Sequence, residues 1–295
     1  MIPLLKTKLA LKAALIASGP IAGVLGLAAL PPPPRDPVPV VTVAPGAVLY
    51  RAAGDFAVDG RPVNAPRRVQ RVRHGLVVMR TQVTQRDYQD CVDAGACMPL
   101  AGRAEARADR PATGVSWQDA SSYAAWFAGR TGQAWRLPTD VEWAHFAGSR
   151  FADDAVIADD GSDSFARRWL ARYDQESGAA GARDKEPKPV GSFGQNERGL
   201  SDLAGNVWEW TDTCFERQAL DARGVPVGAR TTNCGVRVVE GEHRSYVTDF
   251  IRDARAGGCA VGLPPANLGF RLVREDRPGL MNLLARWRGR LAAAA

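Results

Sequence analysis

A short run of residues, 196–210, constrains this chain more than any other part of it. It reads N-E-R-G-L-S-D-L-A-G-N-V-W-E-W, which has neither the roughly 3.6-residue period of an amphipathic helix nor the alternation of a half-buried strand. Its glycines allow backbone conformations that other residues resist. Trp208 and Trp210 flank Glu209, so in an extended backbone both indoles can enter a core while the acid points the other way. The run therefore predicts a polar turn that leads into a buried aromatic segment.

Oxygen-bearing side chains dominate the first half of this run. Asparagine and acidic side chains, together with backbone carbonyls freed by the turn, make the hard-oxygen environment that calcium prefers. A buried aromatic turn without any ligand is the alternative that composition leaves open.

Three blocks of the sequence resemble the formylglycine-generating enzyme (sulfatase-modifying factor) family. The first is G-L-S-D-L-A-G-N-V-W-E-W at 199–210, the second spans Gly114–Trp143 and the third spans Asn267–Val273. Their order and spacing match the family pattern over roughly residues 70–275. The resemblance implies one α+β domain with the irregular, loop-rich fold of that family, a variant of the C-type lectin fold.

The resemblance also implies a structural calcium site in the 196–201 turn. The family's other calcium site needs an asparagine where this chain has Arg172-Tyr173-Asp174, so it is not expected here. Calcium is the expected cofactor, and most of its ligands are backbone carbonyl oxygens. The implied ligands are Asn196, Glu197, Gly199 and Ser201.

The copper site of that family is altered in this chain. Members that oxidise a cysteine of a client sulfatase hold copper with two cysteines around an H-R-S-Y segment, and thiolates are the soft ligands that Cu(I) selects. This chain keeps H-R-S-Y at 243–246, but Glu242 and Val247 flank it. The nearest cysteines are Cys234 and Cys259. The sequence therefore predicts that copper is not bound and that formylglycine is not formed.

Two classes of function remain open. The first is an oxidative maturation enzyme that acts on a peptide or a peptide-derived substrate. Its candidate catalytic residues are Glu242, His243 and Tyr246, and Arg244 and Ser245 are the candidate substrate-binding residues. The second is a non-catalytic, calcium-stabilised recognition module, because C-type-lectin-like folds often serve binding. We expect an enzyme to expose the acid and the histidine in one groove, and a binder to have a polar or aromatic cleft without such a pair.

Other metal sites are not indicated by the histidines. The chain has three, His74, His145 and His243, and they lie far apart in sequence. His145 falls on a predicted helix and is interpreted as structural. For Arg244, a structural ion pair is the competing interpretation. Arg255 and Arg271 match family positions that are also interpreted as structural.

Residues 1–30 predict export. Three lysines precede an apolar run at 13–30, as in a signal peptide or a signal anchor, and its length is near the ~20 residues that span a bilayer. The Pro-rich residues 31–45 predict a stiff spacer. We expect a periplasmic or other extracytoplasmic location, with 13–30 as the candidate anchor in the inner membrane. Residues 46–276 are the expected folded domain, and 277–295 are a basic amphipathic tail.

The cysteines fit an oxidising compartment. Cys91 and Cys97 close a short loop, Cys214 and Cys234 flank an Arg-rich insertion, and Cys259 is left over. This pattern predicts two disulfides and one free thiol. The net charge of +6 is scattered, and no basic helix with interleaved aromatics indicates nucleic-acid binding. The expected partner is a peptide, a small molecule or a protein of the same compartment.

Three capping signals predict helices. Thr84 begins one, Ser116 begins a second that ends near Gly132, and Thr139 with Glu142 forms a capping box for a third that Gly148 stops. The apolar residues 77–80 predict a strand.

Overall fold

The computed structural model describes residues 38–101, 107–152, 186–253 and 267–276, all of which lie in the compact unit Asp36–Ala295. Several expectations fall outside these ranges: the export segment, Arg172 to Asp174, Arg255, Cys259 and the basic tail. Among the described residues, no helix has the length and apolar character needed to cross a membrane.

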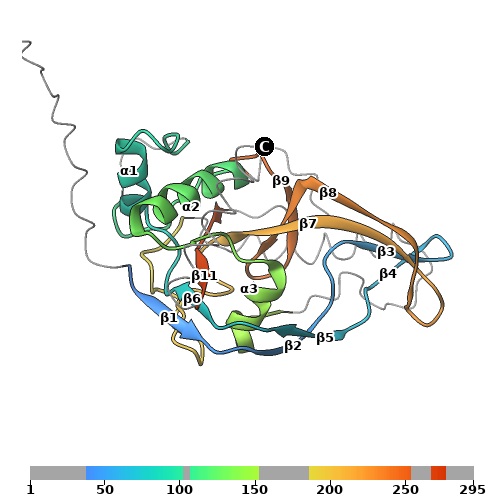
Figure 1. Ribbon diagram of the computed structural model, residues 1–295. Helices are drawn as coiled ribbons and strands as arrows, with labels where there is room; N and C mark the ends of the chain where they lie inside the picture. Colours follow the sequence, from blue (N-terminus) through green and yellow to red (C-terminus); the bar gives the residue numbers. More distant parts are fainter. Residues whose placement is uncertain (1–37, 102–106, 153–185, 254–266, 277–295) are drawn as a thin grey trace, which may run out of the picture. The chain divides into compact units, whose positions relative to one another are not determined.

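Strands dominate the described structure, with three α-helices packed beside them (Figure 1). One sheet has the order β1-β6-β11, a second has the order β4-β3-β7-β8-β9 with β10 beside β7, and β2 and β5 form a separate ribbon. The predicted α+β class is confirmed. The strands are β1 (Val40–Val43), β2 (Gly46–Tyr50), β3 (Asp55–Val58), β4 (Arg61–Val63), β5 (Arg68–Val72), β6 (Leu76–Met79), β7 (Trp208–Leu220), β8 (Pro226–Glu240), β9 (Ser245–Thr248), β10 (Leu268–Gly269) and β11 (Val273–Glu275).

β1 lies inside the stretch that was expected to be a Pro-rich spacer. Its residues V-V-T-V are β-branched, which favours a strand, and they pair antiparallel with β6. The strand predicted at 77–80 corresponds to β6, and β11 pairs with its other edge. Segments from both ends of the described chain therefore close around β6.

The three predicted helices are present, and each begins at the expected residue. α1 (Gln85–Asp93), α2 (Trp117–Thr131) and α3 (Asp140–Ala147) all start with a complete capping box, whose N-caps are Thr84, Ser116 and Thr139. Such caps satisfy N–H groups that the first helical turn leaves without partners, and each contributes about 1 kcal/mol. A short 3₁₀ turn, Gly148–Arg150, follows α3.

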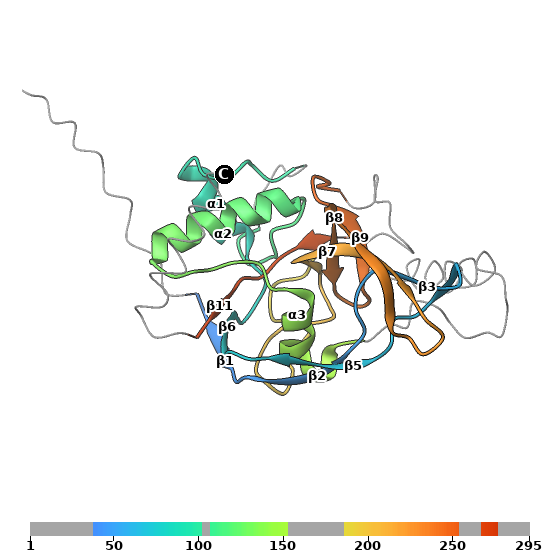
Figure 2. The same cartoon turned by 45° about the vertical axis from the view of Figure 1, so that its right-hand side comes forward.

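The helices cover two different parts of the core. α1 and α2 lie together, and an aromatic cluster that includes Tyr88, Tyr123 and Phe270 packs beneath them. α3 lies next to β2 and β5 in both views, and it buries Trp143 and Phe146 (Figures 1 and 2).

A buried ion pair connects the three blocks of sequence that resemble the formylglycine-generating enzymes. Arg271 is 0% exposed, and its Nε and Nη2 each lie 2.6 Å from a carboxylate oxygen of Glu209. Glu209 also accepts hydrogen bonds from Trp143 Nε1 (3.0 Å) and Gln82 Nε2 (2.8 Å). Arg271 Nη2 donates to the Ser201 carbonyl at 2.9 Å. We call these five residues the Arg271 hub.

Candidate functional site

The segment 242–247 contains the candidate catalytic and substrate-binding residues. It runs from the turn after β8 into β9. Glu242 and His243 lie in a bend and are partly exposed. The next four residues, 244–247, are buried. Val247 is 0% exposed and belongs to the main hydrophobic cluster. The flanking position therefore fills the core and offers no metal ligand.

His243 is held by Trp208. The Trp208 indole Nε1 donates to the His243 carbonyl at 3.0 Å, and the two rings meet edge-on with centroids 5.2 Å apart. The His243 Nδ1 lies 3.1 Å from the Arg244 carbonyl oxygen. Gly241 packs so closely that an added Cβ would lie 2.7 Å from the Trp208 ring. The bend is thus fixed by packing against the aromatic end of the 196–210 run.

Tyr246 and Ser245 point into the protein. The Tyr246 hydroxyl accepts a hydrogen bond from the Gly54 N–H at 2.8 Å, and its ring meets Phe215 edge-on at 5.1 Å. Burial raises the pKa of Tyr246 to about 12, so the phenol stays protonated at neutral pH. Ser245 is 0% exposed, and its hydroxyl has no hydrogen-bond partner within the described chain. Both side chains are therefore enclosed by the protein.

Arg244 sits in a second buried network, which we call the Arg244 hub. Its Nε lies 2.8 Å from Glu240 and its Nη2 lies 3.3 Å from Asp140. The guanidinium also lies 5.1 Å from the centre of the Tyr50 ring, and the Tyr50 hydroxyl donates to Asp140. The geometry matches the structural ion pair that was the competing interpretation of Arg244, and it turns the guanidinium away from solvent.

One of the two carboxyl groups in the Arg244 hub is expected to carry a proton. Burial, followed by the charge of Asp140, raises the pKa of Glu240 well above its usual range, although Arg244 acts in the opposite direction. A protonated Glu240 leaves one carboxylate, Asp140, to balance one guanidinium. This balance makes the hub a neutral structural unit, since an unpaired buried charge is costly.

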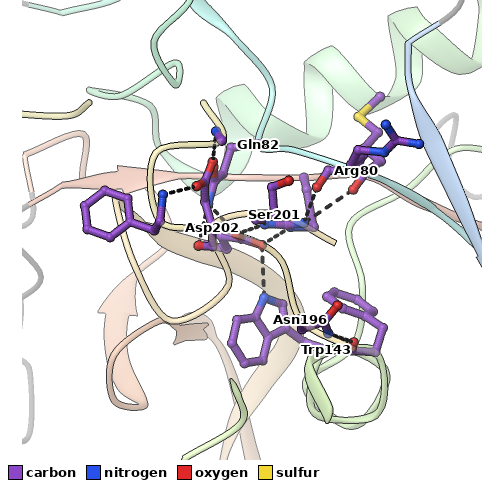
Figure 3. Close-up of polar contacts among 12 residues, drawn as sticks. Arg80, Gln82, Trp143, Asn196, Ser201 and Asp202 are labelled. Atoms are coloured by element: carbon purple, nitrogen blue, oxygen red, sulfur yellow. Dashed lines mark hydrogen bonds and ion pairs between the residues drawn. The ribbon is translucent and has the colours of Figure 1, made fainter. Parts of the chain in front are cut away.

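The 196–201 turn is organised by hydrogen bonds of Asn196 (Figure 3). Its Nδ2 donates to the carbonyls of Phe146 (2.9 Å) and Ala147 (3.0 Å). Its Oδ1 accepts from the N–H groups of Arg198 and Leu200, both at 3.0 Å. Asn196 therefore clamps the turn onto the end of α3 and has no side-chain hydrogen-bonding capacity left over.

The other expected calcium ligands are engaged as well. The Ser201 carbonyl faces the Arg271 guanidinium, a cation, and the Glu197 carboxylate accepts from the Ser149 N–H (3.1 Å) and hydroxyl (2.6 Å). Gly199 has a φ of +79°, which glycine adopts without strain. Within the described ranges, no group of three His, Cys, Asp or Glu could hold a metal. The Asn196 side chain, the Glu197 carboxylate and the Ser201 carbonyl thus have protein partners, and calcium binding stays a prediction.

Both predicted disulfides are present. Cys91 and Cys97 are bonded, and so are Cys214 and Cys234, which lie on the paired strands β7 and β8. His145 is buried with its Nε2 3.0 Å from the Ala44 carbonyl, as expected of a structural histidine.

An open groove lies beside the β7–β8 hairpin, away from the 242–243 bend. Alternate residues of β7 form one wall, and the segment 65–70 forms the other. Arg68 Nη2 donates to the Gly224 carbonyl at 2.9 Å, and Arg230 lies 3.1 Å from Glu216. We call this the hairpin groove; it is lined by Tyr50, Ala52, Phe56, Ala65, Pro66, Arg68, Gln70, Glu216, Gln218, Leu220, Gly224, Pro226 and Arg230.

Sequence reasoning did not find the hairpin groove or the Arg244 hub. The Arg-rich insertion between Cys214 and Cys234 indicates a disulfide-closed loop, and its sequence does not indicate a groove. Tyr50 and Asp140 belong to different elements 90 residues apart, and no motif connects them.

Comparison with known proteins gives a consistent family. Residues 28–276 match the sequence profile of the "Sulfatase-modifying factor enzyme 1-like domain". The chain is 32% identical over 184 residues to the formylglycine-generating enzyme of Streptomyces coelicolor, which covers 57% of this chain and 54% of the relative. It is also 33% identical over 185 residues to the inactive Cα-formylglycine-generating enzyme 2 of Bos taurus, covering 54% of this chain and 53% of the relative. The chain thus spans about half the length of these relatives.

A solved structure shares the fold. PvdO from Pseudomonas aeruginosa superimposes with a TM-score of 0.51 at 20% sequence identity, and the match covers 80% of this chain and 94% of that protein. At this identity the likeness concerns the fold alone. It confirms the predicted loop-rich fold of the formylglycine-generating enzymes.

Proposed function

Because the chain belongs to the sulfatase-modifying factor enzyme 1-like family, we propose that it is a non-catalytic recognition member of that family, which binds an extended peptide segment of a partner protein in the hairpin groove. The observation that carries this proposal is the state of the 242–247 segment. Four of its residues are buried, and Glu242 and Val247 replace the thiolate ligands that copper chemistry needs. Residues 244–247 therefore pack inside the fold, and the hairpin groove is lined by other residues.

The shape of the hairpin groove fits an extended chain. Three lining residues of β7, Glu216, Gln218 and Leu220, are spaced by two, so the groove follows the strand. The four steps from residue 216 to residue 220 cover about 13 Å at roughly 3.3 Å each, which is the length of about five extended residues. Tyr50 and Phe56 contribute aromatic surface to the same groove. Because β7 is paired with β3 and with β8 over these residues, a peptide in the groove would be recognised through the lining side chains.

The charge of the hairpin groove favours an acidic peptide. The groove lining contains one carboxylate, Glu216, and it forms an ion pair with Arg230. Arg68 donates to a backbone carbonyl. One net positive charge therefore remains in the groove. Complementary charge contributes to the on-rate and to specificity more than to affinity.

The compartment of this binding is proposed to be extracytoplasmic. The two disulfides support an oxidising environment, because such bonds are rare in reducing compartments. The predicted export segment points the same way.

Fluorescence anisotropy with labelled decapeptides tests the groove. The acidic probe is (Asp-Ser)5, and the controls are (Asn-Ser)5 and (Lys-Ser)5. We expect the acidic probe to bind the full chain most tightly, and the Arg68→Glu variant to weaken it roughly tenfold, or ~1.4 kcal/mol. The matched control is Arg217→Glu, which makes the same charge change at a 71%-exposed side chain outside the groove lining. Equal binding by both variants would show that the groove is not the site.

One observation favours a second candidate, a metal-free maturation enzyme acting on a peptide-derived substrate. Glu242 and His243 are the partly exposed residues of the 242–247 segment. Trp208 holds His243 in place through a hydrogen bond to its carbonyl. In this function they would act as the acid and base, with the protonated Tyr246 limited to a structural role. Oxygen uptake by the full chain without added metal, supplied with a cysteine-containing peptide and compared between the native chain and Glu242→Ala, tests this second function.

A further inference from the structure

One face of the β2–β5 ribbon is exposed, basic and apolar at once. Leu49 and Val69 are directly paired across the two strands and are 47% and 62% exposed. Ala47 and Arg71, the next pair with side chains on the same face, are also exposed. We call these four residues the ribbon face.

The opposite face of the ribbon is already used by the fold. Tyr50 and Val72 are buried there, and Gly46 packs against His145 of α3 so closely that an added Cβ would lie 2.6 Å from its ring. Both views show α3 next to β2 and β5 (Figures 1 and 2). The hairpin groove uses this inner side too, through Tyr50, Arg68 and Gln70. The ribbon face is therefore a separate surface from the hairpin groove. A role for it does not depend on the proposed function.

The strand β5 and the residues that flank it carry charge of one sign. From Arg61 to Arg86 the sequence contains no aspartate or glutamate. Arg71 and Arg73 are both exposed, and neither forms an ion pair with any described residue. Some other surface arginines are paired with carboxylates, such as Arg217 with Asp55 and Arg223 with Asp221. An unneutralised cationic patch attracts an anionic surface.

We propose that the ribbon face docks on an anionic phospholipid bilayer. Leu49 and Val69 would enter the interfacial region while Arg71 and Arg73 contact the lipid headgroups. Exposed aliphatic side chains beside cations are the chemistry of interfacial membrane binding, and arginines near an anionic leaflet strengthen it. The four residues of the ribbon face are not among those that line the hairpin groove, and their exposure suits contact with a broad surface.

Hydrogen exchange of the full chain in nanodiscs tests this proposal. The probes are discs of phosphatidylglycerol and discs of phosphatidylcholine, and the readout is exchange in peptides that cover 45–50 and 67–73. We expect exchange there to be at least about threefold slower in the anionic discs, without a change in the β7–β8 hairpin. The Arg71→Gln/Arg73→Gln variant should abolish the difference, and Leu49→Ser/Val69→Ser should reduce it.

The matched control is Arg217→Gln/Arg223→Gln, which removes the same charge from the hairpin and should keep the difference. Exchange of each variant in phosphatidylcholine discs reports whether its ribbon is folded. Equal exchange of the native chain in both discs would overturn the proposal. Protection by a soluble Asp-rich peptide and not by anionic discs would also overturn it, and would assign the face to an acidic protein.

Discussion

Replacing Arg271 with methionine should destabilise the folded chain by about 3–5 kcal/mol, since removal of one partner from a buried ion pair leaves an uncompensated charge. Glu209 would keep its bonds to Trp143 and Gln82 but lose the bidentate guanidinium, and the Ser201 carbonyl would lose its donor. Thermal unfolding followed by circular dichroism should show a midpoint lower by roughly 6–20 °C.

The control for this variant is Arg217→Met, which removes an arginine whose ion pair with Asp55 is exposed. Exposed pairs contribute about 0–1 kcal/mol, so its midpoint should fall by at most a few degrees. A loss in Arg271→Met as small as that of the control would mean that the Arg271 hub does not hold the fold together.

Replacing Arg244 with methionine is the second large effect that we expect. The loss should be about 3 kcal/mol or more, because the fully buried carboxyl group of Asp140 would lose its ion-pair partner. Urea unfolding monitored by tryptophan fluorescence measures it. If Arg244 instead contacted a ligand and not the core, the variant would unfold at the same urea concentration as the native chain.

A second variant separates lost charge balance from lost packing. Arg244→Met/Asp140→Asn removes the cation together with the carboxylate that lies beside it. Glu240 is left unchanged, because its raised pKa favours the uncharged form. We expect the double variant to recover at least about half of the lost stability, as expected of two residues that interact directly. Strictly additive losses would contradict the ion-pair account of the Arg244 hub.

Local chemistry made part of this fold predictable from the sequence. The caps at Thr84, Ser116 and Thr139 depend on residues three positions apart, so spacing alone located all three helix starts. The disulfides followed from cysteine spacing, and the family followed from motifs that preserve the Glu209–Arg271 pair. In each case the interacting residues either are close in sequence or lie in recognisable blocks.

Long-range pairing explains what the sequence did not reveal. β1 lies in a stretch that looked like a spacer, because its partner β6 begins more than thirty residues later. The inward orientation of Arg244 depends on Asp140 and Tyr50, which come from α3 and β2. The hairpin groove needs the segment 65–70 to meet a hairpin that begins at Trp208. Residue type alone suggested catalysis at 242–246, whereas burial decides which of those side chains can meet a ligand.

Oxygen uptake by the purified full chain, supplied with copper(I) and a cysteine-containing peptide, tests the absence of catalysis most directly. We predict uptake equal to that of copper and peptide without the protein, because Glu242 and Val247 supply no thiolate and Val247 is fully buried. Uptake well above that background, with conversion of the peptide cysteine, and its loss in Glu242→Ala or His243→Ala, would contradict the account and establish the chain as an oxidative enzyme.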